Sequence, residues 1–170
     1  MIEYNKYPEL PPTIKEQLDS YIDNEFGHIP FVSNMKWSSP EWTIFLRENS
    51  EISTFLNIVI REVNFDSRKV QVAGINNVIT PKKFRGNGYA SMIMNEAKSF
   101  IFNQLNLEHA LLLCADSLIP FYTKLGWYQV DSKVYFEQPS GKKLYDSNTL
   151  LLSKESSINP REIDLNGQPW

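Results

Sequence analysis

One segment, residues 82–105, constrains the fold more than any other. It begins Lys-Lys-Phe-Arg-Gly-Asn-Gly and continues with apolar residues every three or four positions: Ala90, Ile93, Met94, Ala97, Phe100, Ile101 and Leu105. An Asn-Gly pair between two apolar runs is typical of a β-hairpin, but a hairpin requires alternation with a period of two after the turn. The helical spacing instead predicts a strand, a glycine loop and then a helix.

A glycine loop that opens a helix is a common binding site for phosphate groups. Its backbone N–H groups converge on the anion, and the helix dipole adds positive potential. Gly86 and Gly88 can adopt positive φ, and Arg85 adds charge at the mouth of the loop. The nucleotide-binding patterns GxxxxGK[ST] and GxGxxG are both absent. The loop alone therefore leaves two readings open, a phosphate site or a structural turn with solvated lysines.

The remaining patterns predict one α+β domain that covers residues 1–170. A helix over residues 13–26 precedes three consecutive strands within residues 41–80, and residues 109–115 form a short buried strand. Counting the strands near the two ends, we expect a central mixed, mostly antiparallel sheet of about seven strands, flanked by helices. The tail, residues 155–170, reads as irregular.

Composition and charge exclude several classes of function. The net charge is −3 and no long basic run exists, so nucleic acid is not the expected partner. No apolar run approaches the ~20 residues that span a bilayer, so we expect no membrane partner. The N-terminus lacks the pattern of a signal peptide, which predicts a cytoplasmic protein. We expect no metal, and Cys114, as the only cysteine, cannot form an intramolecular disulfide.

Two signatures in the right order resemble the GNAT superfamily of N-acetyltransferases. Residues 78–94, VITPKKFRGNGYASMIM, fit its loop pattern [Q/R]-x-x-G-x-[G/A] through Arg85, Gly88 and Ala90. Residues 114–130, CADSLIPFYTKLGWYQV, are similar to its second signature, a strand followed by FYxKLGF. The resemblance implies a GNAT-like fold, splayed between the fourth and fifth strands, with acetyl-coenzyme A as co-substrate and no metal.

The resemblance also implies roles for individual residues. Tyr122 would be the catalytic acid that protonates the departing coenzyme A thiolate, and the backbone N–H of Ile79 would stabilise the oxyanion. The residues expected to bind the cofactor are the strand edge Val78, Ile79 and Thr80 and the loop residues Arg85, Gly86, Asn87, Gly88, Tyr89, Ala90 and Ser91. We expect direct transfer in a ternary complex. The alternative is a ping-pong route through an acetylated Cys114, but we expect the Cys114 thiol to be buried and inert.

For the acceptor, the chain resembles the aminoglycoside 2′-N-acetyltransferase branch. Its tail, IDLNGQPW, has the form of one that places a terminal carboxylate, here that of Trp170, at the substrate. That branch carries an acidic residue where this chain has Asn76, and an amide cannot accept the proton of the amine. The base role is then vacant or moved, with Glu25, His28, Asp116 and Asp164 as unranked candidates.

The expected acceptor is a related small-molecule primary amine rather than an aminoglycoside. The expected substrate-binding residues are Asn76, Asp116, Trp37 and Trp170. Aromatic walls suit sugars and cationic groups. Transfer to a protein or peptide, and a non-catalytic acyl-coenzyme A binding module, are the competing hypotheses. A homodimer is a further option, because dimers are common in the superfamily.

Overall fold

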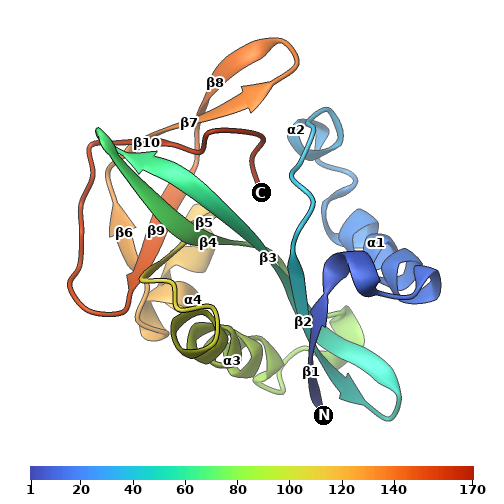
Figure 1. Ribbon diagram of the computed structural model, residues 1–170. Coiled ribbons are helices and arrows are strands. Elements are labelled where there is room, and N and C mark those ends of the chain that lie inside the picture. The colour runs from blue at the N-terminus through green and yellow to red at the C-terminus, as the bar shows by residue number, and fades with distance from the viewer.

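The computed structural model describes all 170 residues, and every strand joins one curled mixed sheet with helices on both faces (Figure 1). The strands are β1 (Ile2–Lys6), β2 (Trp42–Glu48), β3 (Glu51–Phe65), β4 (Arg68–Ile79), β5 (His109–Cys114), β6 (Tyr128–Val130), β7 (Lys133–Gln138), β8 (Gly141–Tyr145), β9 (Asn148–Ser153) and β10 (Glu162–Asp164). The helices are α1 (Pro12–Phe26), α2 (Pro30–Ser33), α3 (Tyr89–Asn103) and α4 (Ile119–Lys124), with 3₁₀ turns η1 (Tyr7–Glu9), η2 (Lys82–Phe84) and η3 (Asp116–Leu118).

The sheet has ten strands rather than the seven predicted. The run 127–138 reads as one strand in the sequence, but it divides at Asp131 and Ser132 into β6 and β7, which pair with different partners. The excursion before β9 adds β8, and the tail, expected to be irregular, adds β10. The α+β class, the mostly antiparallel sheet and the flanking helices are confirmed.

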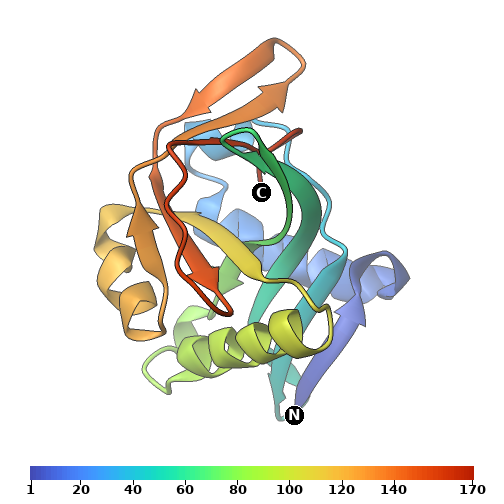
Figure 2. The ribbon, with the colours of Figure 1, turned by 60° about the vertical axis from the view of Figure 1, so that its left-hand side comes forward.

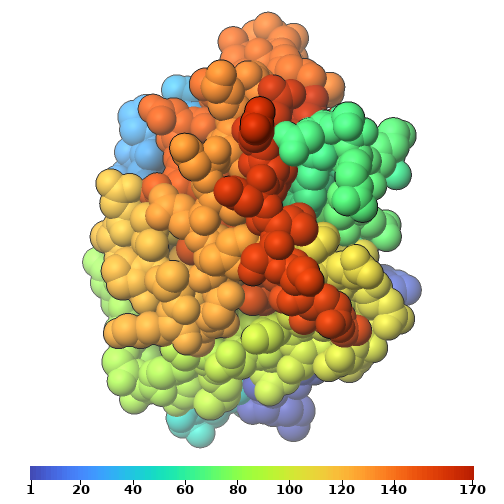
Figure 3. Space-filling model, turned by 90° about the vertical axis from the view of Figure 1, so that its left-hand side faces the viewer, coloured from blue at the N-terminus to red at the C-terminus, as the bar shows by residue number.

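The strand order closes the sheet into a half-barrel. Its path runs β6-β9-β5-β4-β3-β10-β7-β8, so β6 and β7, which are consecutive in the chain, lie far apart along it. β10, from the tail, connects β3 to the β7–β8 hairpin, because it pairs antiparallel with β3 and parallel with β7. Figures 2 and 3 show the tail, in red, filling the seam between the orange strands and the green β3–β4 turn.

Three buried clusters hold these layers together. Helices α3 and α4 cover one face, where Ile93, Ile101 and Tyr122 pack against β-strand residues. Helix α1 covers the other face through Leu18, which packs with Phe45 and Phe55. The third cluster fills the half-barrel and includes the last residue, Trp170. The strands alternate between these clusters because successive side chains point to opposite faces.

Helix α3 begins at Tyr89, one residue before Ala90, the first apolar residue of the helical spacing. Gly88 precedes it with φ 77°, a left-handed conformation, and Gly86 has φ 83°. A Cβ added at either glycine would meet no atom within 4 Å. These glycines are therefore required for backbone conformation rather than for close packing. None of the helices, the longest of which has 15 residues, could cross a lipid bilayer.

Candidate active site

Strands β4 and β5 separate partway along their length. They pair only through Val72–His109, Ala73–Ala110 and Gly74–Leu111, after which β5 pairs with β9 alone. Beyond Gly74, a bulge in β4 sets Asn77 at φ 53° while the register against β3 shifts. A bulge bends a strand and re-aims its side chains. The result is an open fork between residues 75–79 and the end of β5, as predicted.

The orientation of the peptide groups in β4 bears on the oxyanion donor, which the sequence predicts at Ile79. The carbonyl of Ile79 accepts a hydrogen bond from Thr54 Oγ1 of β3 at 3.0 Å, and Ile79 pairs with Phe55. In an extended residue the N–H and C=O point the same way, so the N–H of Ile79 also faces β3. The preceding residue, Val78, faces the opposite side. This geometry directs the N–H of Val78 toward the fork, and the identity of the oxyanion donor stays a prediction.

The glycine loop presents a row of free backbone donors. No N–H group from Gly86 to Ser91 donates to a protein atom. The loop side chains do not occupy the donors either: the Asn87 amide instead donates to the carbonyls of Phe84 and Arg85, at 3.1 and 3.4 Å. Six adjacent unpaired amides at the start of a 15-residue helix form a ready site for an anion such as a pyrophosphate.

Arg85 ties this loop to its surroundings. Its Nε donates to the carbonyl of Thr80 at 2.9 Å, and its Nη2 forms an ion pair with Glu25 of α1 at 2.7 Å. Both partners are partly exposed, so the pair fixes geometry more than it stabilises the fold. Glu25 is consequently engaged at the loop.

Tyr122 lies on α4 beneath the fork, in the same buried cluster as Ile75 and Cys114. The residue is 6% exposed, and no protein atom hydrogen-bonds to its hydroxyl. Burial, and then the neighbouring Cys114, raise the pKa of the Tyr122 hydroxyl well above its usual range. The phenol therefore remains protonated at neutral pH, which is the state a proton donor needs.

A cavity of about 380 Å³ opens on the side of the sheet that α1 covers. Three of the four predicted substrate-binding residues, Trp37, Asn76 and Trp170, line it together. The other lining residues are Tyr7, Asp19, Ile22, Phe26, Val32, Ser38, Ser39, Pro40, Asn57, Ile75, Asn77, Leu113 and Tyr145. Oδ1 of Asn76 is buried without a hydrogen-bond partner, a state that costs free energy until a ligand or water supplies a donor.

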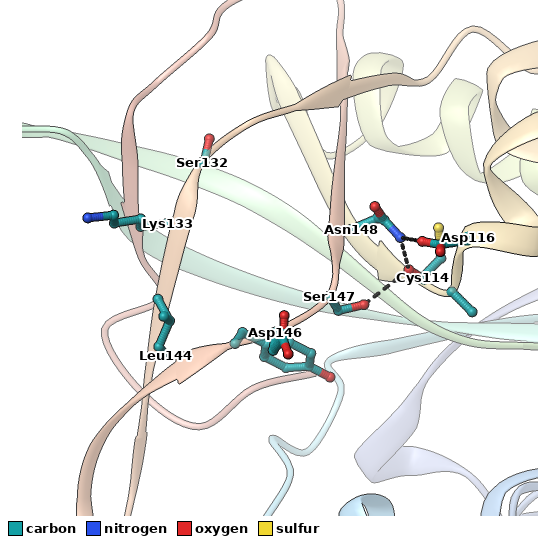
Figure 4. A pocket seen from close by; sticks show the side chains of 10 residues that line it. Cys114, Asp116, Ser132, Lys133, Leu144, Asp146, Ser147 and Asn148 are labelled. Carbon is teal, nitrogen blue, oxygen red and sulfur yellow. Dashed lines mark hydrogen bonds between the residues drawn. The ribbon is translucent and has the colours of Figure 1, made fainter.

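Asp116, the fourth predicted substrate-binding residue, lies elsewhere. It lines a second cavity, of about 650 Å³, that shares only Tyr145 with the first. Figure 4 shows that Asp116 accepts a hydrogen bond from Asn148, at 2.5 Å, while Asn148 and Ser147 also donate to the carbonyl of Cys114. These bonds join the end of β5 to the start of β9, so Asp116 has a structural role in this arrangement.

The tail places Trp170 at the first cavity, where its buried side chain contacts Leu111 and Arg61. Its indole Nε1 donates to the carbonyl of Leu111 at 3.3 Å, and the guanidinium of Arg61 lies 5.4 Å from the ring centroid. Arg61 also donates to the carbonyl of Gln168 at 2.6 Å and to Ser38 Oγ at 2.5 Å. Trp170 is 3% exposed, so the last residue is part of the core.

Sequence similarity assigns the family. Residues 26–130 match the model of the acetyltransferase (GNAT) domain, a span that contains the fork, the loop and Tyr122. The chain belongs to the GNAT acetyltransferase family. No curated protein sequence is significantly similar to it.

Solved structures carry the same GNAT fold at low sequence identity. The GNAT family N-acetyltransferase YhbS from Escherichia coli, in complex with CoA, is 11% identical with a TM-score of 0.64, over 98% of this chain and 89% of that one. An aminoglycoside 6′-N-acetyltransferase complexed with coenzyme A is 12% identical, with a TM-score of 0.61 over 92% and 99%. A probable N-acyltransferase from Enterococcus faecalis is 16% identical, with a TM-score of 0.57 over 79% of this chain and 33% of that longer one.

Acetyl-coenzyme A is the co-substrate of this GNAT acetyltransferase, and the residues present suit it. The free amides of residues 86–91 match the needs of its pyrophosphate, and the fork leaves a strand edge for its pantetheine arm. No group of three or more His, Cys, Asp or Glu side chains is arranged to hold a metal ion.

None of the four base candidates lines the first cavity of this GNAT acetyltransferase. Glu25 is paired with Arg85, Asp116 is bonded to Asn148, and Asp164 is bonded to Lys142. The one acidic side chain that lines the cavity is that of Asp19, which the sequence reading missed. The signal was available, because Asp19, Ile22 and Phe26 share one face of α1 by their spacing.

Proposed function

We propose that the protein transfers an acetyl group from acetyl-coenzyme A to a primary amine of a small molecule, by direct transfer in a ternary complex. The observation that carries this proposal is the cavity of about 380 Å³ beside the fork, to whose wall the tail contributes Trp170. A cavity of this size matches small-molecule sites. A protein substrate would need an open groove instead.

The chain's own groups supply each step of the transfer. The nitrogen of a neutral amine attacks the thioester carbonyl, and the N–H of Val78 stabilises the resulting oxyanion. The C–S bond then breaks, Tyr122 gives its proton to the thiolate, and the nitrogen loses its own proton to water. Water returns a proton to Tyr122 before the next turnover. A positioned acid of this kind contributes about 10²- to 10⁴-fold to the rate.

A thiol nucleophile has little support in this site. Burial, and then the charge of Asp116, raise the pKa of the Cys114 thiol to about 11. The thiolate is the reactive form, and it is scarce at neutral pH under these conditions. We therefore propose that Cys114 is inert and that no acetyl-cysteine forms.

The relation to the aminoglycoside 2′ branch is also a proposal. It is supported by the enclosed tail and by Trp170 at the cavity. The absence of an acid at Asn76 favours an acceptor other than an aminoglycoside. A cytoplasmic location and a homodimer stay predictions of the sequence.

Thiol release from acetyl-coenzyme A tests the function on a panel of alkylamines, polyamines, amino sugars, aminoglycosides and peptides. We expect turnover with small amines and a fall of about 10²-fold or more in kcat for Tyr122→Phe, with unchanged binding of acetyl-coenzyme A. Turnover of peptides alone would indicate a protein acetyltransferase. Binding without turnover of any amine, and no effect of Tyr122→Phe, would indicate a non-catalytic module.

A further inference from the structure

The charge of the cavity beside the fork restricts its ligand. Among its 16 lining residues there is no Lys, Arg or His, and Asp19 carries the one acidic side chain. A wall with one acidic side chain and no basic side chain favours a cation and disfavours a carboxylate or phosphate ligand.

Aromatic rings add to this preference. Trp37, Tyr145 and Trp170 line the same cavity. Cations bind favourably over the faces of such rings, and tryptophan is the best of them. Phe31 of α2 packs edge-on against both Trp37 and Tyr145, at 6.2 and 5.5 Å between ring centroids, and so fixes two of these rings.

The negative charge and the fork lie on different elements. Asp19 belongs to α1. Burial raises the pKa of the Tyr7 hydroxyl, and the charge of Asp19 raises this pKa further, so Asp19 lies near Tyr7. Asn76 belongs to β4, next to the bulge that opens the fork. An amine that attacks the thioester must be neutral, and its place is at the fork. An ammonium group that pairs with Asp19 must therefore be a second nitrogen of the substrate.

We propose that the acceptor is a small diamine whose reacting nitrogen lies beside Asn76 and whose second nitrogen, an ammonium, is bound by Asp19. The inference rests on the proposed function and names its substrate class. The buried Oδ1 of Asn76 accepts an N–H of the reacting amine, which ends its unpaired state. Asp19 acts as a specificity determinant, because it contacts the end of the substrate that does not react.

The test compares matched amines in the full-length protein. Thiol release gives kcat/KM for 1,4-diaminobutane, for butylamine, which lacks the second nitrogen, and for 4-aminobutanoate, which carries a carboxylate in its place. We expect the diamine to be the best substrate and the carboxylate the worst. Asp19→Asn should lower kcat/KM for the diamine about fivefold or more and leave butylamine unchanged, since it removes one partly exposed ion pair.

Two further variants sharpen the result. Glu16→Gln removes an exposed carboxylate of the same helix that lies outside the cavity, and it should leave all three values unchanged. Asp19→Lys should reverse the order, so that 4-aminobutanoate exceeds the diamine. Thermal unfolding of each variant shows whether the fold is retained.

The outcomes separate this inference from the function on which it rests. Equal turnover of the diamine and butylamine would overturn the diamine proposal while leaving acetyl transfer intact. An equal loss for both amines in Asp19→Asn would overturn it too, because a proton acceptor or a structural residue gives that result. No turnover of any amine on the panel would refute the proposed function itself.

Discussion

The indole of Trp170 lies directly on Gly74: a Cβ added to Gly74 would stand 2.1 Å from Cε2 of the ring. Gly74 and Leu111 are the last pair that joins β4 to β5, and Trp170 Nε1 donates to the carbonyl of Leu111. The last residue of the chain therefore packs at the apex of the fork, where the two strands part. This contact couples the tail to the catalytic opening.

Gly74→Ala should displace Trp170 and destabilise the protein. The methyl group would overlap a buried ring, and overpacking of this kind costs about 1–3 kcal/mol. Denaturant unfolding measures the loss, and the KM for the amine should rise because Trp170 lines the cavity. In the double variant with Trp170→Ala, the cost of Gly74→Ala should shrink. Additive effects would show that the two residues do not act on each other.

Arg61→Lys should loosen the tail without breaking the sheet. The guanidinium donates to the carbonyls of Leu165 and Gln168 and to Ser38, and a lysine ammonium cannot reproduce this planar fork. We expect a loss of about 1–3 kcal/mol, together with faster hydrogen exchange across residues 162–170. Arg68→Lys, at an exposed arginine with no hydrogen bond to the protein, is the matched control. Unchanged exchange in the tail would contradict a clamping role.

The loop and the helix after it could be read from the sequence because local rules govern both. Gly88 takes positive φ at the start of α3, and the apolar residues of the helix face the core, as their spacing requires. The fork could be expected only through the family resemblance, since the bulge at Asn77 depends on register against a distant strand.

Long-range pairing decided the features that the sequence reading missed. Whether Val78 or Ile79 faces the fork depends on the contact of Ile79 with Thr54, 25 residues away in the chain. Arg61 and the tail are 107 residues apart at the hydrogen bond to Gln168, and no local pattern marks that pair. The position of Asp116 outside the first cavity depends on a distant residue in the same way, because its partner Asn148 belongs to β9.

Substitution of Gly88 should distinguish backbone conformation from packing at the loop. A Cβ would meet no atom there, so the cost arises from φ 77° alone. Gly88→Val should cost about 1–2 kcal/mol or more, whereas Gly88→Asn should cost less, because asparagine tolerates this conformation better. Calorimetric titration should show that coenzyme A binds more weakly to Gly88→Val than to Gly88→Asn. Equal losses for Val and Asn would argue against the conformational explanation.

Cys114→Ala should retain acetyl transfer and reduce the pH dependence of stability in alkali. Burial, and then Asp116, raise the pKa of the thiol to about 11, against about 8.5 in an unfolded chain. The folded state therefore holds this proton more tightly, so the contribution to stability is present below pH ~8.5 and is lost as the pH rises toward 11. Removing the thiol removes this loss, and it also removes the part of the rise in the Tyr122 pKa that Cys114 causes, which acts in the same direction.

Denaturant unfolding from pH 8 to 11 should accordingly show a shallower decline for Cys114→Ala than for the wild type. Mass spectrometry of the wild type with acetyl-coenzyme A should show no added acetyl group, since direct transfer forms no covalent intermediate. An acetylated protein that disappears in Cys114→Ala, together with turnover, would establish the ping-pong route instead. The unfolding result tests whether Cys114 is buried, and the labelling result tests whether it is inert. Both expected results are required for a buried and inert Cys114.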